Sequence, residues 1–415
     1  MAFAISNPIY REDKVSISTE PSDQSLDVSG TRSPYPFFAA KRATEPVWHG
    51  TIMDYGIVPP EMIPDDEYTL FTYPLVSQAF REHSRFSSSG YDSTMGLIIG
   101  PSMLGMTGQK HRDHRNLVSK AFRAKSLARW EPEFIVPICA ELIDDVKADG
   151  SADLVEALTF EFPTRVIAKL LGLPADDLEM FRKLSFDLIS IQQDIEAGFN
   201  ASMSLATYFR EQIEQRRSKL TEDIIGDLVS AEIGGEKLDD DAIITFLRLL
   251  LPAGLETTYR SSGNLFYLLL THPDQLTAVR ENRDLIPSAI EEGLRVETPL
   301  VTVLRQTTED VQMGDTVIPA GATVDLCVGS ANRDEDRWPD SDQFDIFRPA
   351  QPHISFAAGI HSCLGLHLAR METRIALTTV LDRLENLELA TAPDVSVSGL
   401  MFRSPTALPV TFTPA

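Results

Sequence analysis

The chain of 415 residues has few cysteines, no excess of basic residues and no long apolar run. Its three cysteines, Cys139, Cys327 and Cys363, are too few and too scattered for a disulfide framework, which favours a reducing cytoplasm. Acidic residues outnumber basic ones by 61 to 37, and the net charge of −24 disfavours binding to nucleic acid or anionic lipid. Because no stretch approaches the roughly 18 apolar residues of a membrane span, and the first residues lack the apolar run of a signal peptide, we expect no membrane anchor.

The composition is that of an ordinary globular protein, with 43% hydrophobic and 24% charged residues. Residues 1–45 carry Ser, Thr, Pro and Asp without a periodic apolar pattern, and we expect an extended N-terminal arm there. Residues 46–415 predict a single domain that is mainly α with a smaller β part. Short strands are expected near 46–85, 300–330 and 387–415.

One long helix is predicted over residues 239–270. Asp239–Asp241 would cap its N-terminus, and Pro273 would end it, because proline disfavours helical conformation at the residue before it. At 1.5 Å per residue its length is about 50 Å, roughly the width of a whole domain. We therefore expect this helix to run through the core.

The sequence Pro252-Ala253-Gly254 interrupts this helix, and Glu256 and Thr257 follow it. Proline lacks the N–H group that a helix needs and glycine is a poor helix former, so a kink or a widened turn is expected. The Thr257 hydroxyl can bond the carbonyl of Ala253 four residues earlier, which loosens the helix further. The result is either a plain packing kink or a groove with an acid, a hydroxyl and free carbonyl groups for water.

The most informative segment is FAAGIHSCLG, residues 356–365, which lies directly before a predicted helix. A thiol at a helix N-terminus is shifted toward the thiolate form, and glycines let the backbone approach a large flat ligand. Two other interpretations stay open on these residues alone. Cys363 can be a small buried apolar residue, or it can form a zinc site with His361 and His367, although a second pair of ligands is missing.

This segment resembles the haem-binding loop of the cytochrome P450 family, whose pattern F-x-x-G-x-[HR]-x-C-x-G it matches at every defined position. The resemblance extends from about residue 45 to the end and implies the cytochrome P450 fold, with the long central helix over the haem. It further implies that Cys363 is the thiolate ligand of the haem iron and that Phe356 packs beside it. His361 and Gly365 would contact the cofactor from the same loop.

Glu292 and Arg295 are three residues apart on one face of a predicted helix, and Arg348 follows in the sequence FDIFRP. Taken alone, the first two residues predict a surface ion pair of small value. In chain order, however, they match the family's E-x-x-R motif and Arg348 matches its third member. The resemblance implies that the three side chains form a buried structural triad behind the haem.

Candidate partners for the haem propionates come from three places in the chain. His111 and Arg115, one helical turn apart, match the family's H-x-x-x-R motif, and Arg305 matches the arginine of the strand after the E-x-x-R helix. Each of these residues could also be a solvated surface residue. The resemblance implies that they bind the propionates together with His361.

The segment AGLETT, residues 253–258, matches the family's [AG]-G-x-[DE]-T-[TS] motif. This match implies that Glu256 and Thr257 are catalytic and hold a water chain that delivers protons to bound O2. Pro252 is unusual for the family, and its effect on the groove stays open.

The resemblance implies a bacterial-type haem-thiolate monooxygenase that contains haem b and hydroxylates a lipophilic substrate with one oxygen atom of O2. No flavin or iron–sulfur motif is present, so electrons from NAD(P)H would arrive through a separate ferredoxin and ferredoxin reductase. The stretch from His111 to Arg129 is the richest basic region for docking such a donor. We expect a monomer in the cytoplasm.

The substrate cannot be identified from the sequence. Family topology implies that Ala253, Gly254, Val301, Met401 and Phe402 line its pocket. Alternative functions are a peroxide-driven peroxygenase, a non-catalytic sensor of gas or redox state, and a haem-thiolate isomerase or reductase. The acid–alcohol pair in the long helix argues against all of these, because none of them needs a proton relay.

Overall fold

The computed structural model describes residues 33–52, 66–119, 122, 124–191, 194–390 and 395–414. Of the N-terminal arm predicted over residues 1–45, residues 1–32 lie outside the described residues. Beyond that point the prediction is wrong, because Tyr35–Thr44 form helix α1. The side chain of Phe38 in this helix is fully buried and contacts Phe71 at a centroid distance of 5.9 Å. Burial of this aromatic group therefore fixes the segment against the domain.

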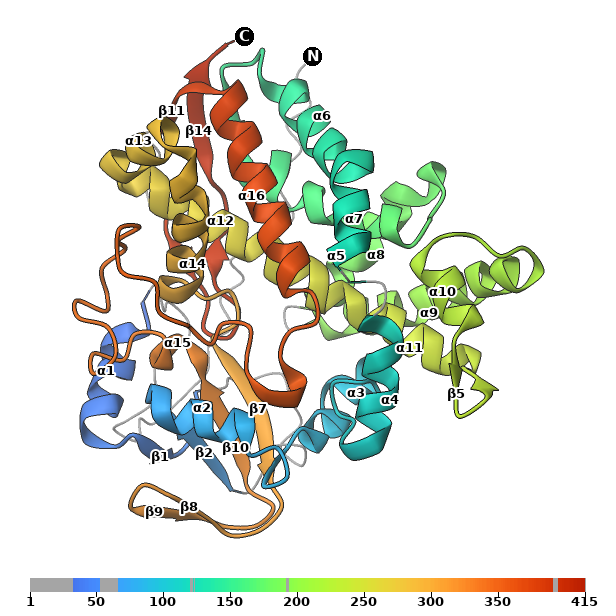
Figure 1. The fold of residues 1–415 in the computed structure, drawn as a ribbon, viewed down its shortest axis with the longest axis vertical. Helices are drawn as coiled ribbons and strands as arrows, with labels where there is room; N and C mark the ends of the chain where they lie inside the picture. The colour runs from blue at the N-terminus through green and yellow to red at the C-terminus, as the bar shows by residue number, and fades with distance from the viewer. Residues whose placement is uncertain are drawn as a thin grey trace.

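Helices form most of the structure and fill its upper and right-hand parts in Figure 1. The helices after α1 are α2 (Tyr73–Arg81), α3 (Met95–Ile99), α4 (Gly108–Ser119), α5 (Ala124–Trp130), α6 (Val136–Val146), α7 (Glu161–Leu170), α8 (Leu178–Ile189), α9 (Ile195–Ser218), α10 (Ile224–Ser230), α11 (Asp240–Leu250), α12 (Thr257–Thr271), α13 (Pro273–Glu281), α14 (Ile286–Val296), α15 (Val328–Ala331) and α16 (Leu366–Arg383). Within the described residues, none of these helices is long and apolar enough to span a membrane.

The β part is divided among several small sheets, of which the largest lies next to α1 and α2 (Figure 1). Its largest sheet has the order β1 (Val47–His49), β2 (Glu67–Leu70), β10 (Thr323–Cys327), β7 (Thr302–Thr307), β3 (Phe86–Ser87), in which only β2 and β10 are parallel. A second sheet has the order β11 (Glu385–Leu389), β14 (Pro409–Thr413), β4 (Ser151–Asp153). The described residues also form three separate two-stranded sheets: β5 (Glu232–Ile233) with β6 (Glu236–Lys237), β8 (Val311–Met313) with β9 (Thr316–Ile318), and β12 (Val397–Ser398) with β13 (Ser404–Pro405). The mainly α fold with a smaller β part is as predicted, although β4, β5 and β6 lie outside the expected strand regions.

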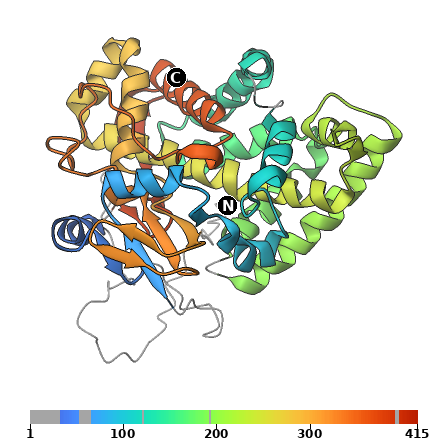
Figure 2. The same cartoon turned by 60° about the horizontal axis from the view of Figure 1, so that its bottom comes forward.

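The predicted long helix is present as α11 and α12, joined without a break by a π-helical turn over Leu251–Glu256. The side chain of Asp239 caps it by accepting a hydrogen bond from the N–H of Ala242 at 2.7 Å. Pro252 lies inside the π-helical turn, which confirms the widened turn expected from the missing N–H group. Figure 2 shows this helix running through the middle of the molecule, between the largest sheet and α16.

Candidate active site

The loop that carries Cys363 is held in a fixed shape directly before α16. The N–H of Cys363 donates to the carbonyl of Phe356 at 2.8 Å, which closes the loop on itself. Gly359 has a φ of 74°, and a Cβ atom at this position would lie 2.4 Å from the carbonyl oxygen of Phe80 in α2. Only glycine fits there, so the loop sits tightly against α2 and presents the sulfur at the start of α16.

The Cys363 sulfur is surrounded by backbone N–H groups and arginine side chains that favour a thiolate able to bind a metal. Burial raises the pKa of its thiol, while hydrogen bonds from the N–H groups of Gly365 and Leu366 and the charges of Arg115 and Arg370 lower it. Backbone donors of this kind stabilise a thiolate and tune a metal bound to it. A Cβ atom at Gly365 would meet no other atom within 4 Å, so space lies open beside the loop.

The other two cysteines lack these features. Burial raises the pKa of Cys139 to about 11 and that of Cys327 still further. Both side chains belong to the apolar core. We therefore regard Cys139 and Cys327 as inert structural residues.

Polar side chains from distant parts of the chain meet around the Cys363 loop. His111 of α4 lies with its ring 4.0 Å from that of His361, and Arg115 donates to the carbonyl of Ser362 at 2.6 Å. Arg305 of β7 is buried with its guanidinium 5.3 Å from the ring of Phe80. The side chains named from the H-x-x-x-R motif are thus brought to the cysteine loop.

Two observations show that these residues fit a haem group with its anionic propionates. His111 is only 1% exposed, yet neither of its ring nitrogens has a hydrogen-bond partner among the described residues. Arg305, also buried, donates to the carbonyl of Leu304 at 2.6 Å, and its side chain has no other hydrogen bond among the described residues. Buried donors of this kind cost free energy unless an acceptor meets them, and a carboxylate is such an acceptor.

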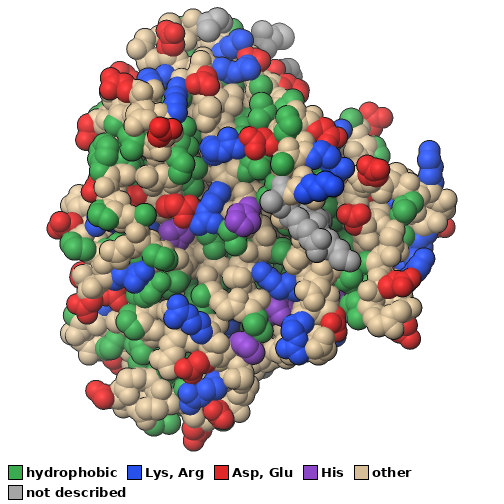
Figure 3. Space-filling view, in the orientation of Figure 1, with side chains coloured by type: hydrophobic (Ala, Val, Ile, Leu, Met, Phe, Trp, Pro, Cys, Tyr) green, Lys and Arg blue, Asp and Glu red, His purple; other side chains and the backbone are tan. Residues whose placement is uncertain are grey.

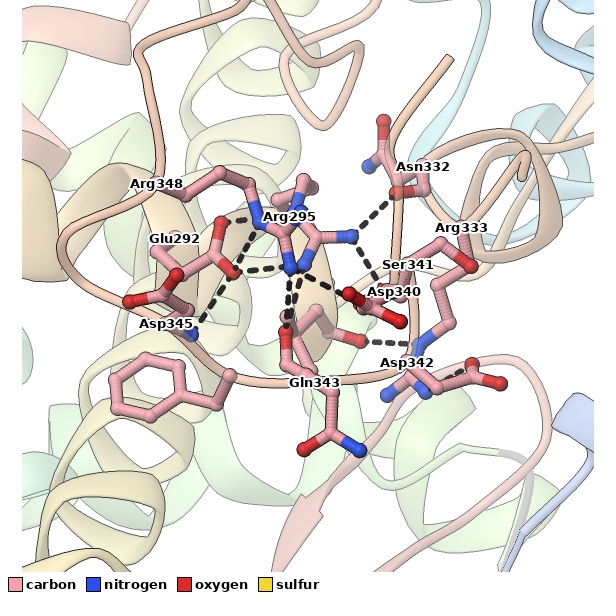
Figure 4. Close-up of polar contacts among 12 residues, drawn as sticks. Glu292, Arg295, Asn332, Arg333, Asp340, Ser341, Asp342, Gln343, Asp345 and Arg348 are labelled. Carbon is pink, nitrogen blue, oxygen red and sulfur yellow. Dashed lines mark hydrogen bonds and ion pairs between the residues drawn. The ribbon is translucent and has the colours of Figure 1, made fainter. Parts of the chain in front are cut away.

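Glu292, Arg295 and Arg348 form one buried network, shown in Figure 4. Arg295 donates to both oxygens of Glu292 at 2.8 and 2.7 Å, and Nε of Arg348 donates to Glu292 at 3.2 Å. The remaining donors of Arg295 reach the carbonyl groups of Asn332, Ser341 and Gln343.

This network ties α14 to the long loop before the cysteine. Asn332, whose carbonyl accepts from Arg295, also bonds the N–H of Ile354 and the hydroxyl of Ser355 through its side chain. Because the side-chain atoms of the triad are directed at one another and at backbone carbonyls, the arrangement suits a structural role and offers no site for substrate.

Glu256 and Thr257 have different surroundings, although they are neighbours in the sequence. The Thr257 hydroxyl donates to the carbonyl of Ala253 at 2.8 Å, as the sequence predicts. Ala253 is exposed, although Leu251 and Leu255 in the same turn are buried. An exposed residue in a helix that crosses the core indicates an open space beside the widened turn. Glu256 is only 3% exposed and pairs with Arg260 at 3.0 Å. Burial raises the pKa of Glu256 to about 7, although the charge and the hydrogen bonds of Arg260 lower it.

Sequence reasoning missed Arg260. Its spacing of four residues from Glu256 is the signal that could have revealed it, because such residues are neighbours on a helix.

The predicted substrate residues do not all face the same space. Gly254, Met401 and Phe402 are partly accessible, and Ala253 is exposed. Val301 instead is fully buried in an apolar cluster that includes Phe38 and Cys327. The N–H of Val301 donates to the carbonyl of Met401 at 2.8 Å. Val301 therefore contacts a predicted substrate residue through its backbone only, while its side chain belongs to the core.

A basic region lies near this site. In Figure 3, Lys, Arg and His side chains gather across the middle of one face, over the start of α16 and beside α4. Arg112 of α4 and Lys125 and Arg129 of α5 are exposed, and Arg129 lies 3.7 Å from both Glu133 and Glu222. Two further residues of the predicted basic stretch, Lys120 and Arg123, lie outside the described residues.

Comparisons with known proteins point to one family. The family model described as Cytochrome P450 matches residues 175–407. The chain is 34% identical to cytochrome P450 monooxygenase PikC of Streptomyces venezuelae, over 91% of this chain and 90% of the relative. It is 33% identical to the vitamin D(3) 25-hydroxylase of Pseudonocardia autotrophica, over 96% of this chain and 99% of the relative. A solved structure of CYP109E1 from Bacillus megaterium in complex with corticosterone matches with a TM-score of 0.81 and 30% identity, covering 92% of this chain and 99% of that one.

Proposed function

This chain belongs to the cytochrome P450 family of haem-dependent monooxygenases, and on that premise we propose that it hydroxylates a lipophilic organic molecule with one oxygen atom of O2. The observation that carries this proposal is the Cys363 loop. Its sulfur accepts two backbone hydrogen bonds, and the same loop lies beside His111 of α4, a buried residue whose ring nitrogens have no hydrogen-bond partner among the described residues. The charge of Arg305, a buried arginine of β7, also acts on His361 of this loop.

In the proposed holoenzyme, the sulfur of Cys363 would bind the haem iron. The propionates would be bound by His111, Arg115, Arg305 and His361. When bound, haem activates O2 with two electrons delivered one at a time. Phe356 and Gly365 belong to the Cys363 loop and would contact the haem from there.

Thr257 and Glu256 would supply the protons. The Thr257 hydroxyl donates to the carbonyl of Ala253, so its oxygen remains able to accept a hydrogen bond from a water molecule. Glu256, with a pKa of about 7, can exchange a proton near neutral pH. The widened turn would hold a water between these two groups and the reacting oxygen.

A lipophilic substrate is part of the proposal. The accessible residues Ala253, Met401 and Phe402 are apolar, and such a surface gains free energy by covering an apolar ligand. The vitamin D(3) 25-hydroxylase and the corticosterone complex among the related proteins are named for lipophilic molecules of the same general kind. We propose a terpenoid or steroid-like substrate.

The proposed electron source is NAD(P)H, through a ferredoxin reductase and a ferredoxin that docks on the basic region around Arg112 and Lys125. We also propose a monomer in the cytoplasm. The supporting observation for the cytoplasm is that none of the three cysteines forms a disulfide.

The holoenzyme, incubated with a ferredoxin, its reductase, NADH and a panel of steroids and terpenoids, should shift its Soret band with the true substrate and form a hydroxylated product. Product with hydrogen peroxide alone but none with the electron donors would identify a peroxygenase. Absence of product under both conditions with every panel member that shifts the Soret band would contradict the monooxygenase proposal.

A further inference from the structure

Arg260 connects two parts of the candidate active site. It follows Glu256 by one helical turn, and both side chains are buried. Its Nε and Nη2 atoms lie 3.3 and 3.0 Å from Oε1 of Glu256. Its Nη1 atom donates to the hydroxyl of Ser404 at 3.0 Å. One guanidinium therefore bonds both the acid of the widened turn and the chain turn that ends in β13.

The turn that Arg260 reaches, residues 400–405, carries two of the predicted substrate residues. The guanidinium lies 5.5 Å from the ring centroid of Phe402, which is partly accessible. Phe402 also pairs with Leu300, so this turn is attached to the chain that enters β7. A ligand that displaces Phe402 would act on Arg260 through this ring and through Ser404.

Arg260 is the charged group that acts on Glu256. Burial raises the pKa of this acid, and the charge and hydrogen bonds of Arg260 are the opposing influence. Charged side chains on the packed elements have other ion-pair partners: Glu161 pairs with Arg182, Arg165 with Glu141, Lys183 with Asp187, Glu292 with Arg295 and Arg403 with Glu297. Glu156 is exposed and Glu372 is buried in α16, and neither is among the charges that act on the pKa of Glu256. Burial thus has the largest effect on the pKa of Glu256, and the guanidinium of Arg260 is the charged group that opposes it.

We propose that Arg260 is a positioning residue that holds Glu256 in place and links the ionisation of this acid to occupancy of the substrate turn at residues 400–405. The inference rests on the proposed function only in treating Glu256 as the proton-carrying acid. A ligand that moves the turn, and with it Ser404 and the bonded Arg260, away from Glu256 weakens the ion pair, and the buried carboxylate then takes a proton from solvent. Proton delivery would in this way become available only after substrate has bound.

The test is an infrared titration of the ferric holoenzyme. The carboxyl band of Glu256 is assigned by its loss in Glu256→Gln. In Arg260→Met the inflection of this band should move to higher pH by about 1–3 units, because removal of a nearby positive charge raises the pKa of an acid. Arg260→Lys retains the charge and should titrate close to the wild type. An inflection in Arg260→Met that coincides with the wild type would overturn the inference.

The link to the substrate turn is tested by repeating the titration with a lipophilic azole bound to the haem. The ligand should raise the inflection in the wild type, and Ser404→Ala should reduce this ligand-dependent change by at least half. This variant removes one hydroxyl at a buried site and keeps the ion pair, so it provides the measurement even if Arg260→Met does not fold. An unchanged ligand effect in Ser404→Ala would overturn the link.

The outcome is separable from that of the proposed function. A wild-type protein with the thiolate-type CO spectrum but no effect of Arg260→Met on the titration would overturn this inference alone. A wild-type protein without that spectrum would overturn the proposed function instead.

Discussion

The ring of His111 lies 4.0 Å from the ring of His361, although one comes from α4 and the other from the loop before α16. Burial and the neighbouring positive charges lower the pKa of His111 to about 4 and that of His361 to about 3. In the protein alone these shifts favour neutral rings at physiological pH, and a neutral imidazole can still donate one hydrogen bond. In the proposed holoenzyme this N–H group would donate a hydrogen bond to a haem propionate.

The first prediction concerns retention of haem. His111→Phe removes a donor that has no partner among the described residues, so the variant should lose haem to an acceptor protein about tenfold faster, as expected for one charge-assisted hydrogen bond. The apoprotein should unfold at the same urea concentration as the wild type or at a higher one. Haem transfer kinetics and urea titration measure the two effects. An unchanged rate of haem loss would remove His111 from the cofactor site.

The second prediction concerns the structural triad. Arg295→Ala leaves the carboxylate of Glu292 buried without its main partner, and this should lower the free energy of unfolding by about 3–5 kcal/mol. The control is Arg210→Ala, which breaks an exposed pair with Asp241 and should cost about 0–1 kcal/mol. Urea unfolding of both variants gives the comparison. Equal losses in the free energy of unfolding would show that the buried network stabilises the protein no more than an exposed ion pair.

The third prediction concerns proton delivery. Thr257→Ala should keep haem and substrate binding but divert electrons to hydrogen peroxide, because the variant lacks the hydroxyl that, in the proposed relay, accepts a hydrogen bond from water beside Ala253. The ratio of product formed to NADH consumed is the measurement. Thr277→Ala removes the same kind of hydroxyl-to-carbonyl bond from α13 and should leave the ratio unchanged. An equal ratio in the wild type and in Thr257→Ala would exclude the threonine from the relay.

The fourth prediction concerns stability and pH. Glu372 is buried in α16, its Oε2 atom has no partner among the described residues, and burial raises its pKa from 4.5 to about 8. The folded protein therefore keeps this proton where the unfolded chain has released it, so its contribution to stability is full below pH 4.5 and is lost as pH rises toward 8.

Glu372→Gln mimics the protonated side chain, and its melting temperature should exceed that of the wild type by an amount that grows across this pH window. Glu388→Gln, at an exposed position of β11, controls for the loss of one acidic residue. A difference in melting temperature between Glu372→Gln and the wild type that is constant with pH would contradict the account.

Local features of the fold could be predicted because the residues that cause them are close in sequence. Asp239 caps the long helix three residues later, and Pro252 removes an N–H group that the helix itself needs. The cysteine loop was identified by a motif whose members lie within ten residues. These features require no knowledge of what packs against them.

Features that depend on distant contacts could not be predicted. The helix at 35–44 is stabilised by burial of Phe38 on Phe71, which the sequence of the helix does not reveal. The bond from Arg260 to Ser404 joins residues from two distant parts of the chain. Val301 was expected in the pocket, but neighbouring residues of an extended chain point to opposite sides, and its side chain lies on the buried one.

The central claim, that Cys363 is the haem ligand, is tested most directly by the absorption spectrum of the ferrous–CO complex. The wild type, Cys139→Ser and Cys327→Ser should all absorb at the long wavelength that a thiolate ligand produces, and Cys363→His should lose this band while keeping haem. Loss of the band in either serine variant, or its persistence in Cys363→His, would contradict the account.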